Sequence, residues 1–234
     1  MKISDICKSS IDEDGERGKR GRRSSLDLMK ARWDNGEGGL MSNNPLPVQI
    51  GLTIITGPMF CGKSAELIRQ IRRLRVAQSN VLMLKPAIDT RSASVSTRDG
   101  QSLDCTAFAS THDLADIIGA HPNFMLAIDE AQFVLARELD HWIDLIRDEM
   151  TKRLIIVAGL NLDFRGEPFP AIADLLPVAT KIQLLSSVCM RCGSDNGVRS
   201  HRLQGGETVV QIGDEEYQAQ CLHCFSQSVV TARS

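Results

Sequence analysis

The run Gly57-Pro58-Met59-Phe60-Cys61-Gly62-Lys63-Ser64 says most about the architecture of this chain. It has the pattern G-x-x-x-x-G-K-S, in which backbone N–H groups and a helix N-terminus surround phosphate oxygens. An apolar, β-branched run at 52–56 precedes it, and apolar residues at helical spacing, Leu67, Ile71 and Leu74, follow it. A strand, a glycine loop and a helix in this order predict a site for a nucleoside triphosphate. In such a loop, Lys63 supplies charge to the β- and γ-phosphates and Ser64 a hydroxyl ligand for Mg²⁺.

The same alternation of strand and helix continues along the chain from Pro47. The patterns predict strands at 49–56, 80–85, 124–128 and 154–159, and helices at 64–78, 114–120 and 137–152. Thr111 or Asp113 is expected to cap the helix at 114–120. Continuous apolar strands that alternate with helices are typical of an α/β fold, whose mostly parallel sheet is covered on both faces.

A pair of acids stands at the end of one of these strands, in Leu126-Ala127-Ile128-Asp129-Glu130. A carboxylate at the carboxyl end of a strand beside the P-loop is where Mg²⁺ and its waters need a ligand, so Asp129 is the candidate. Glu130 points to the other side of the chain and is the candidate base for a hydroxyl acceptor. The alternative, a surface turn with two solvated acids, is less favoured in a chain with a P-loop.

The overall composition excludes several classes of protein. The chain has 234 residues, 42% of them hydrophobic, and a net charge of −2. No apolar run reaches the length of a membrane span, and the N-terminus lacks the apolar segment of a secretory signal. We therefore expect a cytoplasmic protein with no membrane partner. An aromatic content of 4% and the slightly negative charge also argue against direct binding of nucleic acid.

Residues 1–47 differ from the rest, because they combine short charged and glycine-rich runs with few apolar residues. We expect a disordered extension, although the basic run at 17–23 leaves a nucleic-acid patch as a less favoured alternative. Met41 lies just ahead of the first strand and is a candidate translation start. The core is then expected at 48–187, a small second lobe at 188–228 and a tail at 229–234.

Four of the seven cysteines form two C-x-x-C pairs near the C-terminus: Cys189, Cys192, Cys221 and Cys224. In a reducing compartment such pairs favour a structural, tetrahedral Zn²⁺ site over disulfides. Buried thiols without a metal are the less favoured alternative.

Several motifs together resemble one known family. The loop G-P-M-F-x-G-K-S, the run D-E-A-Q-F at 129–133, the run D-F-R-G-E-P-F at 163–169 and the cysteine pairs are similar to those of the cellular (type II) thymidine kinases. The resemblance covers nearly all of the chain after the N-terminal extension. It implies transfer of phosphate from ATP to the 5′-hydroxyl of thymidine, with deoxyuridine as a possible acceptor. It also implies a RecA-like P-loop core, a zinc lobe with a "lasso" loop, a homotetramer and feedback inhibition by thymidine triphosphate.

The resemblance also assigns roles to individual residues. Glu130 matches the catalytic base, with Lys63 and Arg91 as the cations that neutralise the migrating charge. Contacts with ATP and Mg²⁺ are implied for Gly57, Pro58, Met59, Phe60, Cys61, Gly62, Lys63, Ser64, Asp89, Arg91, Asp129 and Gln132. Contacts with the nucleoside are implied for Met59, Phe133, Leu160, Phe164, Phe169, Val209, Val210, Gln211, Ile212, Gly213 and Tyr217.

Two other functions are compatible with parts of the pattern. One is a RecA-like, DNA-dependent ATPase with a zinc module, which should show a basic groove with stacking aromatic residues. The other is a kinase for another deoxynucleoside. One departure from the family concerns the base pocket, since Ser200 stands where threonine is common.

Overall fold

The computed structural model describes residues 49–88, 94–96, 100, 102–203 and 216–233, all within the compact unit Pro47–Ser234. The predictions for the N-terminal extension, for Asp89 and Arg91, and for the lasso residues Val209, Val210, Gln211, Ile212 and Gly213 lie outside the described residues.

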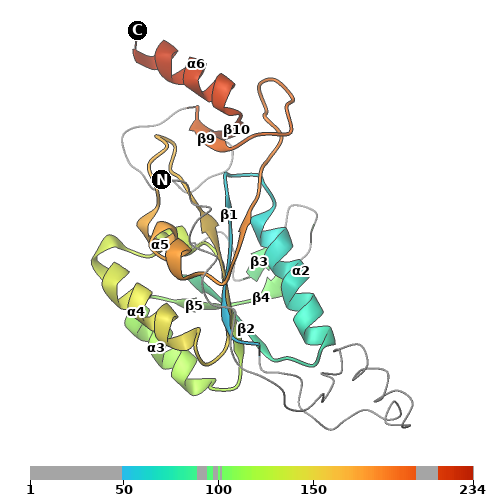
Figure 1. Ribbon diagram of the computed structural model, residues 1–234, viewed down its shortest axis with the longest axis vertical. Coiled ribbons are helices and arrows are strands. Elements are labelled where there is room, and N and C mark those ends of the chain that lie inside the picture. Colours follow the sequence, from blue (N-terminus) through green and yellow to red (C-terminus); the bar gives the residue numbers. More distant parts are fainter. Residues whose placement is uncertain (1–48, 89–93, 97–99, 101, 204–215, 234) are drawn as a thin grey trace, which may run out of the picture. The chain divides into compact units, whose positions relative to one another are not determined.

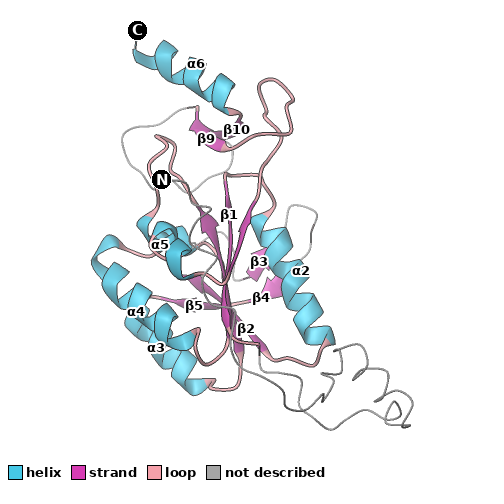
Figure 2. Ribbon diagram, in the orientation of Figure 1, coloured by secondary structure: helices cyan, strands magenta, loops and turns pink. Residues whose placement is uncertain are grey.

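The described part of the chain alternates strands and helices as the sequence predicts (Figure 1, Figure 2). In chain order the elements are β1 (Gly51–Gly57), α2 (Lys63–Val76), β2 (Val81–Pro86), β3 (Ser94–Ser96), β4 (Ser102–Asp104), β5 (Thr106–Phe108), α3 (Thr111–Ala120), β6 (Met125–Ile128), the 3₁₀ helices η2 (Ala131–Phe133) and η3 (Ala136–Glu138), α4 (Leu139–Glu149), β7 (Leu154–Leu160), α5 (Pro170–Ala173), the 3₁₀ helix η4 (Leu176–Val178), β8 (Lys181–Leu184), β9 (Arg199–Arg202), β10 (Tyr217–Gln220) and α6 (Leu222–Arg233).

A six-stranded sheet in the order β5-β2-β6-β7-β1-β8 forms the centre of the core, and each of its pairings is parallel. This confirms the predicted α/β class. The P-loop strand β1 lies between β7 and β8, and it is buried along its whole length. Because the strands are parallel, the segments that follow β1, β6 and β7 leave the sheet at one edge, where ligands bind in such folds.

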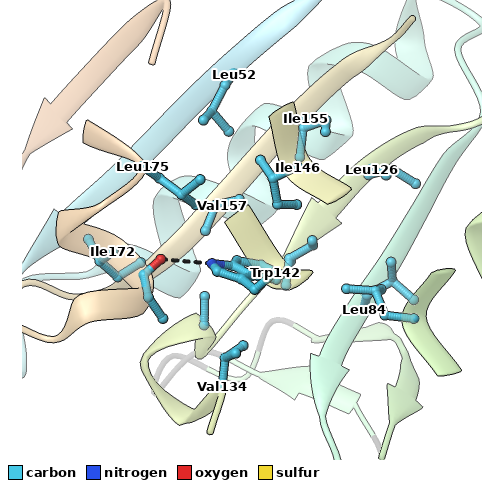
Figure 3. Packing of buried hydrophobic residues seen from close by; sticks show 14 of the residues in the cluster. Leu52, Leu84, Leu126, Val134, Trp142, Ile146, Ile155, Val157, Ile172 and Leu175 are labelled. Atoms are coloured by element: carbon cyan, nitrogen blue, oxygen red, sulfur yellow. Dashed lines mark hydrogen bonds between the residues drawn. The ribbon is translucent and has the colours of Figure 1, made fainter. Parts of the chain in front are cut away.

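Helices cover both faces of this sheet, with α2 on one side and α3, α4 and α5 on the other (Figure 1). Side chains of β1 alternate between the two layers, since Ile54 packs toward α4 and Ile55 toward α2. Trp142 of α4 is fully buried, and its indole N–H donates to the carbonyl oxygen of Ala171 at 2.9 Å (Figure 3). This bond ties α4 to α5, the helix that follows the loop after β7.

The ends of the helices differ from the sequence prediction in one instructive place. Ser110, rather than Thr111 or Asp113, caps α3, and its Oγ accepts from the backbone N–H of Asp113 at 3.2 Å. Asp113 in turn accepts from the N–H of Ala109 at 2.8 Å. The two side chains satisfy N–H groups reciprocally, so the cap begins one residue earlier than expected.

The C-terminal region, from about residue 188, is built differently. The antiparallel pair β9 and β10 and helix α6 surround the cysteine pairs. Helix α6 continues to Arg233, through the expected boundary between the lobe and the tail at 228. Among the described residues, no helix has both the length and the apolar character needed to cross a bilayer.

Candidate functional site

The P-loop leaves β1 at Gly57 and enters α2 at Gly62, and its backbone is tightly constrained. A Cβ on Gly57 would lie 2.4 Å from the carbonyl oxygen of Leu185. This contact is too short for any residue with a side chain, so only glycine fits at this position. Gly62 caps α2 with a φ of 82°, and Phe60 has a φ of 64°, a conformation that is costly for a residue with a side chain. The loop therefore has a strained backbone that its surroundings hold in place.

Lys63 and Ser64, the first two residues of α2, point into this loop and toward the neighbouring strand. The ammonium group of Lys63 donates to the carbonyl oxygen of Pro58 at 2.7 Å. Ser64 donates its hydroxyl to Oδ2 of Asp129 at 2.8 Å, which brings together the P-loop and the end of β6. A hydroxyl and a carboxylate side by side are hard oxygen donors, and they suit Mg²⁺ better than a softer metal.

A groove of about 830 Å³ begins beside the loop and follows α2. Its lining includes Glu66, which pairs with Arg69, and the further arginines Arg72 and Arg73, so the surface next to the loop carries a net positive charge. Positive charge beside the P-loop raises the local concentration of anionic ligands.

Asp129 is only 2% exposed and is held by two hydrogen bonds. Besides the bond from Ser64, its Oδ1 accepts from the backbone N–H of Glu130 at 2.9 Å. Burial, and next the adjacent charge of Glu130, raise the pKa of Asp129 to about 7, although the bond from Ser64 opposes this shift. A bound cation would stabilise the ionised form of this buried carboxyl group, as expected of a metal ligand at this position.

Glu130 follows directly, with a φ of 54° that turns the chain from β6 into η2. Its carboxylate accepts from the side-chain amide of Gln132, Nε2 to Oε2, at 2.5 Å. The other end of that amide accepts from the backbone N–H of Leu160 at 3.0 Å, at the end of β7. Gln132 therefore connects the candidate base to the strand next to the P-loop strand.

The residues predicted to contact the nucleoside lie on several segments at this same edge. Phe133 ends η2, Leu160 ends β7, and Phe169 precedes α5; η2 packs against both β7 and α5. Phe164 lies in the loop after β7, and Tyr217 lies in β10 of the C-terminal region, where it is buried. These side chains are half-buried or buried, as expected of a pocket wall.

Arg202 joins two of these aromatic side chains and has no counterpart in the sequence prediction. Its guanidinium lies 3.5 Å from the centroid of the Phe164 ring and 6.0 Å from that of Tyr217. A cation over a ring face is attracted to the ring, most strongly when it is desolvated, and Arg202 is only 8% exposed. No local signal marks this arginine, because Phe164 lies far from it along the chain.

The four paired cysteines form a cluster in which all sulfur atoms lie within 4.8 Å of one another. The Sγ atoms of Cys192 and Cys221 are 3.8 Å apart. Four sulfurs around one Zn²⁺, each at about 2.3 Å, have S···S distances of about 3.8 Å, so this spacing fits a tetrahedral metal site.

Burial and neighbouring groups shift the pKa values of two thiols in this cluster. Burial, and next the neighbouring thiol of Cys221, raise the pKa of Cys224. For Cys189, burial alone raises the pKa, but backbone N–H groups, that of Cys221 foremost, outweigh it and lower the pKa. Four adjacent sulfurs cannot all ionise without a compensating cation. The cluster could therefore hold a metal ion.

Two hydroxyl groups connect this C-terminal region to the P-loop. The backbone N–H of Met59 donates to Oγ of Ser200 at 2.9 Å, and Ser187 donates its hydroxyl to the carbonyl oxygen of Phe60 at 3.2 Å. Ser200 is buried, at 3% exposed. The region that carries the cysteines therefore contacts the phosphate-binding loop directly, a link that the sequence does not predict.

The family model described as thymidine kinase matches residues 50–225 of the chain. The chain belongs to the thymidine kinase family. A thymidine kinase of Mycoplasmoides gallisepticum is 36% identical and is aligned over 72% of this chain and 78% of its own length. Thymidine kinases of Ureaplasma parvum and Pyrobaculum aerophilum are 34% and 35% identical, over 77% and 73% of this chain and 85% and 95% of their own lengths.

Membership of the thymidine kinase family confirms the resemblance predicted from the motifs. It makes this protein a nucleotide-binding enzyme of the kinase type, and it does not favour the alternative of a DNA-dependent ATPase. The roles of the individual site residues stay predictions, and Asp89 and Arg91 lie outside the described part of the chain.

Proposed function

We propose that this protein transfers the γ-phosphoryl group of ATP to the 5′-hydroxyl of thymidine, giving thymidine monophosphate and ADP. The main support is the contact between Ser64, at the end of the P-loop, and Asp129, which directly precedes Glu130. This contact occurs in a member of the thymidine kinase family. This arrangement would bring a metal-binding pair and a base together where the start of α2 meets the end of β6.

The triphosphate of ATP binds at the P-loop, where backbone N–H groups and the N-terminus of α2 face the phosphate oxygens. Ser64 and Asp129 would hold Mg²⁺, which would supply positive charge to offset the negative charge of the phosphates. Lys63 lies over the same loop and adds a positive charge to the transferred group. Arg91, which the family resemblance gives the same task, stays a prediction.

Thymidine binds at the carboxyl edge of the sheet, between the loop after β7 and the C-terminal region. Phe164 and Tyr217 supply apolar faces for the base, and Arg202 holds them in place through its contacts with both rings. The predicted lasso residues are expected to hydrogen-bond the base edge with their backbone groups.

In the transfer step, the 5′-oxygen of thymidine forms a bond to the γ-phosphorus, while the bond from that phosphorus to the β–γ bridging oxygen breaks. The carboxylate of Glu130 accepts the proton of the hydroxyl group. ADP leaves with the bridging oxygen and its electron pair. The protein contributes mainly position and charge, because phosphoryl transfer needs little else.

We further propose that the four cysteines hold one Zn²⁺ in a closed structural site. All four positions of a tetrahedral ion are filled by sulfur, so no position stays open for catalysis. A homotetramer, feedback inhibition by thymidine triphosphate and a cytoplasmic location stay predictions.

A nucleoside panel tests the proposed activity. The full-length chain is incubated with γ-labelled ATP and with thymidine, deoxyuridine, deoxycytidine or duplex DNA. We expect labelled 5′-monophosphate from thymidine, a poor yield from deoxycytidine, and no product from a Lys63→Met variant. ATP hydrolysis that depends on DNA, without a labelled nucleotide, would contradict the proposal.

A further inference from the structure

The backbone of Glu130 adopts an unusual conformation that fixes where its side chain begins. Its φ of 54° is in the left-handed region, which costs a residue with a side chain about 1–3 kcal/mol. Hydrogen bonds on both sides maintain it, because its N–H donates to Asp129 and its carbonyl accepts from the N–H of Phe133 at 3.0 Å. The direction in which the chain leaves β6 is thereby set, but the rotamer of the Glu130 side chain needs a further constraint.

Gln132 supplies that constraint from a buried position, with 5% of its surface exposed. Its two polar atoms have opposite partners: Nε2 donates to Oε2 of Glu130, and Oε1 accepts from the N–H of Leu160. A backbone N–H can only donate, so the amide cannot be turned over without losing both bonds. The amide N–H therefore faces the carboxylate in one fixed orientation.

The site at which this amide sits is shaped by Gly159. A Cβ on Gly159 would lie 2.9 Å from Oε1 of Gln132 and 2.8 Å from Cδ1 of Ile172, so the amide occupies the space that the missing side chain leaves. The carbonyl oxygen of Gly159 accepts from the hydroxyl of Thr56 at 2.8 Å, and Thr56 is the residue before the P-loop. A short series of contacts thus runs from the P-loop strand through β7 and Gln132 to Glu130.

We propose that Gln132 is a positioning residue that holds the carboxylate of Glu130 at a fixed place relative to the P-loop. This inference rests on the proposed role of Glu130 as the base. The family resemblance implies a contact between Gln132 and ATP, but both ends of its amide are bonded to protein groups, Glu130 and Leu160. Gln132 therefore acts through Glu130, because its N–H anchors one oxygen of the carboxylate. Small displacements of a catalytic group have large effects on rate, so the anchor contributes to turnover rather than to substrate affinity.

Two substitutions distinguish the effect of the amide N–H of Gln132 from the effect of the rest of its side chain. Gln132→Glu keeps an acceptor for the N–H of Leu160 but replaces the donor with a second carboxylate, whereas Gln132→Met removes both hydrogen bonds at similar volume. For both variants of the full-length protein we expect kcat to fall about 10- to 100-fold, with the KM values for ATP and thymidine within about twofold.

Gln183 provides a matched control outside the site. Its amide also bridges a carboxylate and another side chain, since it donates to Glu66 at 3.2 Å and accepts from Gln70. Gln183→Met should leave kcat and both KM values unchanged. Gly159→Ala tests the same contact from the other side: it keeps Gln132 but displaces its amide, and should lower kcat like Gln132→Met.

A double-mutant cycle with Glu130→Gln decides whether Gln132 acts through Glu130. The variant that carries both Glu130→Gln and Gln132→Met should be no slower than Glu130→Gln alone. Additive losses, or a Gln132→Met variant with raised KM values and normal kcat, would overturn the inference. Normal turnover in Glu130→Gln would overturn it together with the assignment of the base.

A crystal structure of Gln132→Met keeps the two proposals distinguishable. A displaced Glu130 carboxylate supports the positioning role even if the nucleoside panel shows no thymidine phosphorylation, which would overturn only the proposed function. An unchanged Glu130 rotamer in that variant overturns the positioning role whatever the substrate proves to be.

Discussion

The two regions that meet at the site are stabilised in different ways. At the carboxyl edge of the sheet, functional residues follow strands that are buried on both faces, such as β1 and β7. In the C-terminal region the strands have four residues each, and apolar side chains remain exposed, among them Val188, Met190, Leu203 and Leu222. The first region is held by a hydrophobic core, and we propose that the second depends on a metal ion bound by its four sulfur atoms.

This difference predicts how each region responds to change. A packed core tolerates the loss of one contact at a cost of a few kcal/mol, whereas a small region without a core loses its fold when its metal is removed. The two regions nevertheless contact each other at Met59 and Phe60, so the response of one reaches the other. The experiments below separate the two regions and then test the contact between them.

Loss of the proposed zinc ion should have the largest effect. Structural zinc sites contribute about 10–16 kcal/mol of apparent binding energy to the folding of their domains. After chelation, or in a Cys221→Ser variant, we expect hydrogen exchange to become fast in β9, β10 and α6 while β1 and β7 stay protected. Equal loss of protection in both regions, or no loss in either, would contradict the proposal that only the C-terminal region needs the metal to stay folded.

Substitution of the proposed base should have the next largest effect. Glu130→Gln retains the shape of the side chain but removes the proton acceptor, so we expect kcat to fall about 10³-fold or more. Because the metal-binding pair is intact, the affinity for ATP should change little. A matched control is Glu138→Gln, because Glu138 accepts from the N–H of Thr111 at 3.1 Å, at the start of α3, and is none of the predicted site residues. Similar losses in both variants would contradict the assignment.

The sequence predicts the first region well for a physical reason. The strands and helices that carry Lys63, Ser64, Asp129 and Glu130 are long enough to show their periodicity, and the glycines of the loop mark the turn between them. Short elements are missed because they lack this signal: β3, β4 and β5 have three residues each. Strand β8 is missed although it borders β1, because two of its four residues are polar.

Contacts between distant residues are the part of the site that the sequence does not predict. The bond between Met59 and Ser200 spans 141 positions, and that between Gln132 and Leu160 spans 28. Neither a pattern nor a spacing connects such residues, and only the packing of the strands brings them together. The cysteines are the exception, because metal geometry imposes a short spacing within each pair.

Protonation of Asp129 should affect metal binding by an intermediate amount. Its pKa in the free protein is raised, to about 7, by burial and by Glu130. Mg²⁺ needs the ionised form, so binding of Mg·ATP should release a proton, and its affinity should fall about tenfold per pH unit below that pKa. Calorimetry in buffers of different ionisation enthalpy measures the released proton.

The same shift has a defined sign for stability. A carboxyl group whose pKa is raised on folding stabilises the protein below its unfolded pKa, and this contribution is lost as the pH rises through the folded value. Asp129→Asn should therefore stabilise the metal-free protein near neutral pH and abolish the proton release. Proton release that persists in Asp129→Asn would assign it to another group.

Removal of the bond between the two regions should have the smallest effect. Ser200→Ala deletes the acceptor for the N–H of Met59, one hydrogen bond worth about 1 kcal/mol, so we expect the KM for ATP to rise about fivefold. Ser200→Thr keeps the hydroxyl and should restore the wild-type value. In the metal-free protein Ser200→Ala should have no further effect, because the region that places the hydroxyl has lost its fold. A fivefold effect that persists without metal would show instead that β9 is held by its contact with the P-loop, and that the second region depends less on its sulfur atoms than the comparison implies.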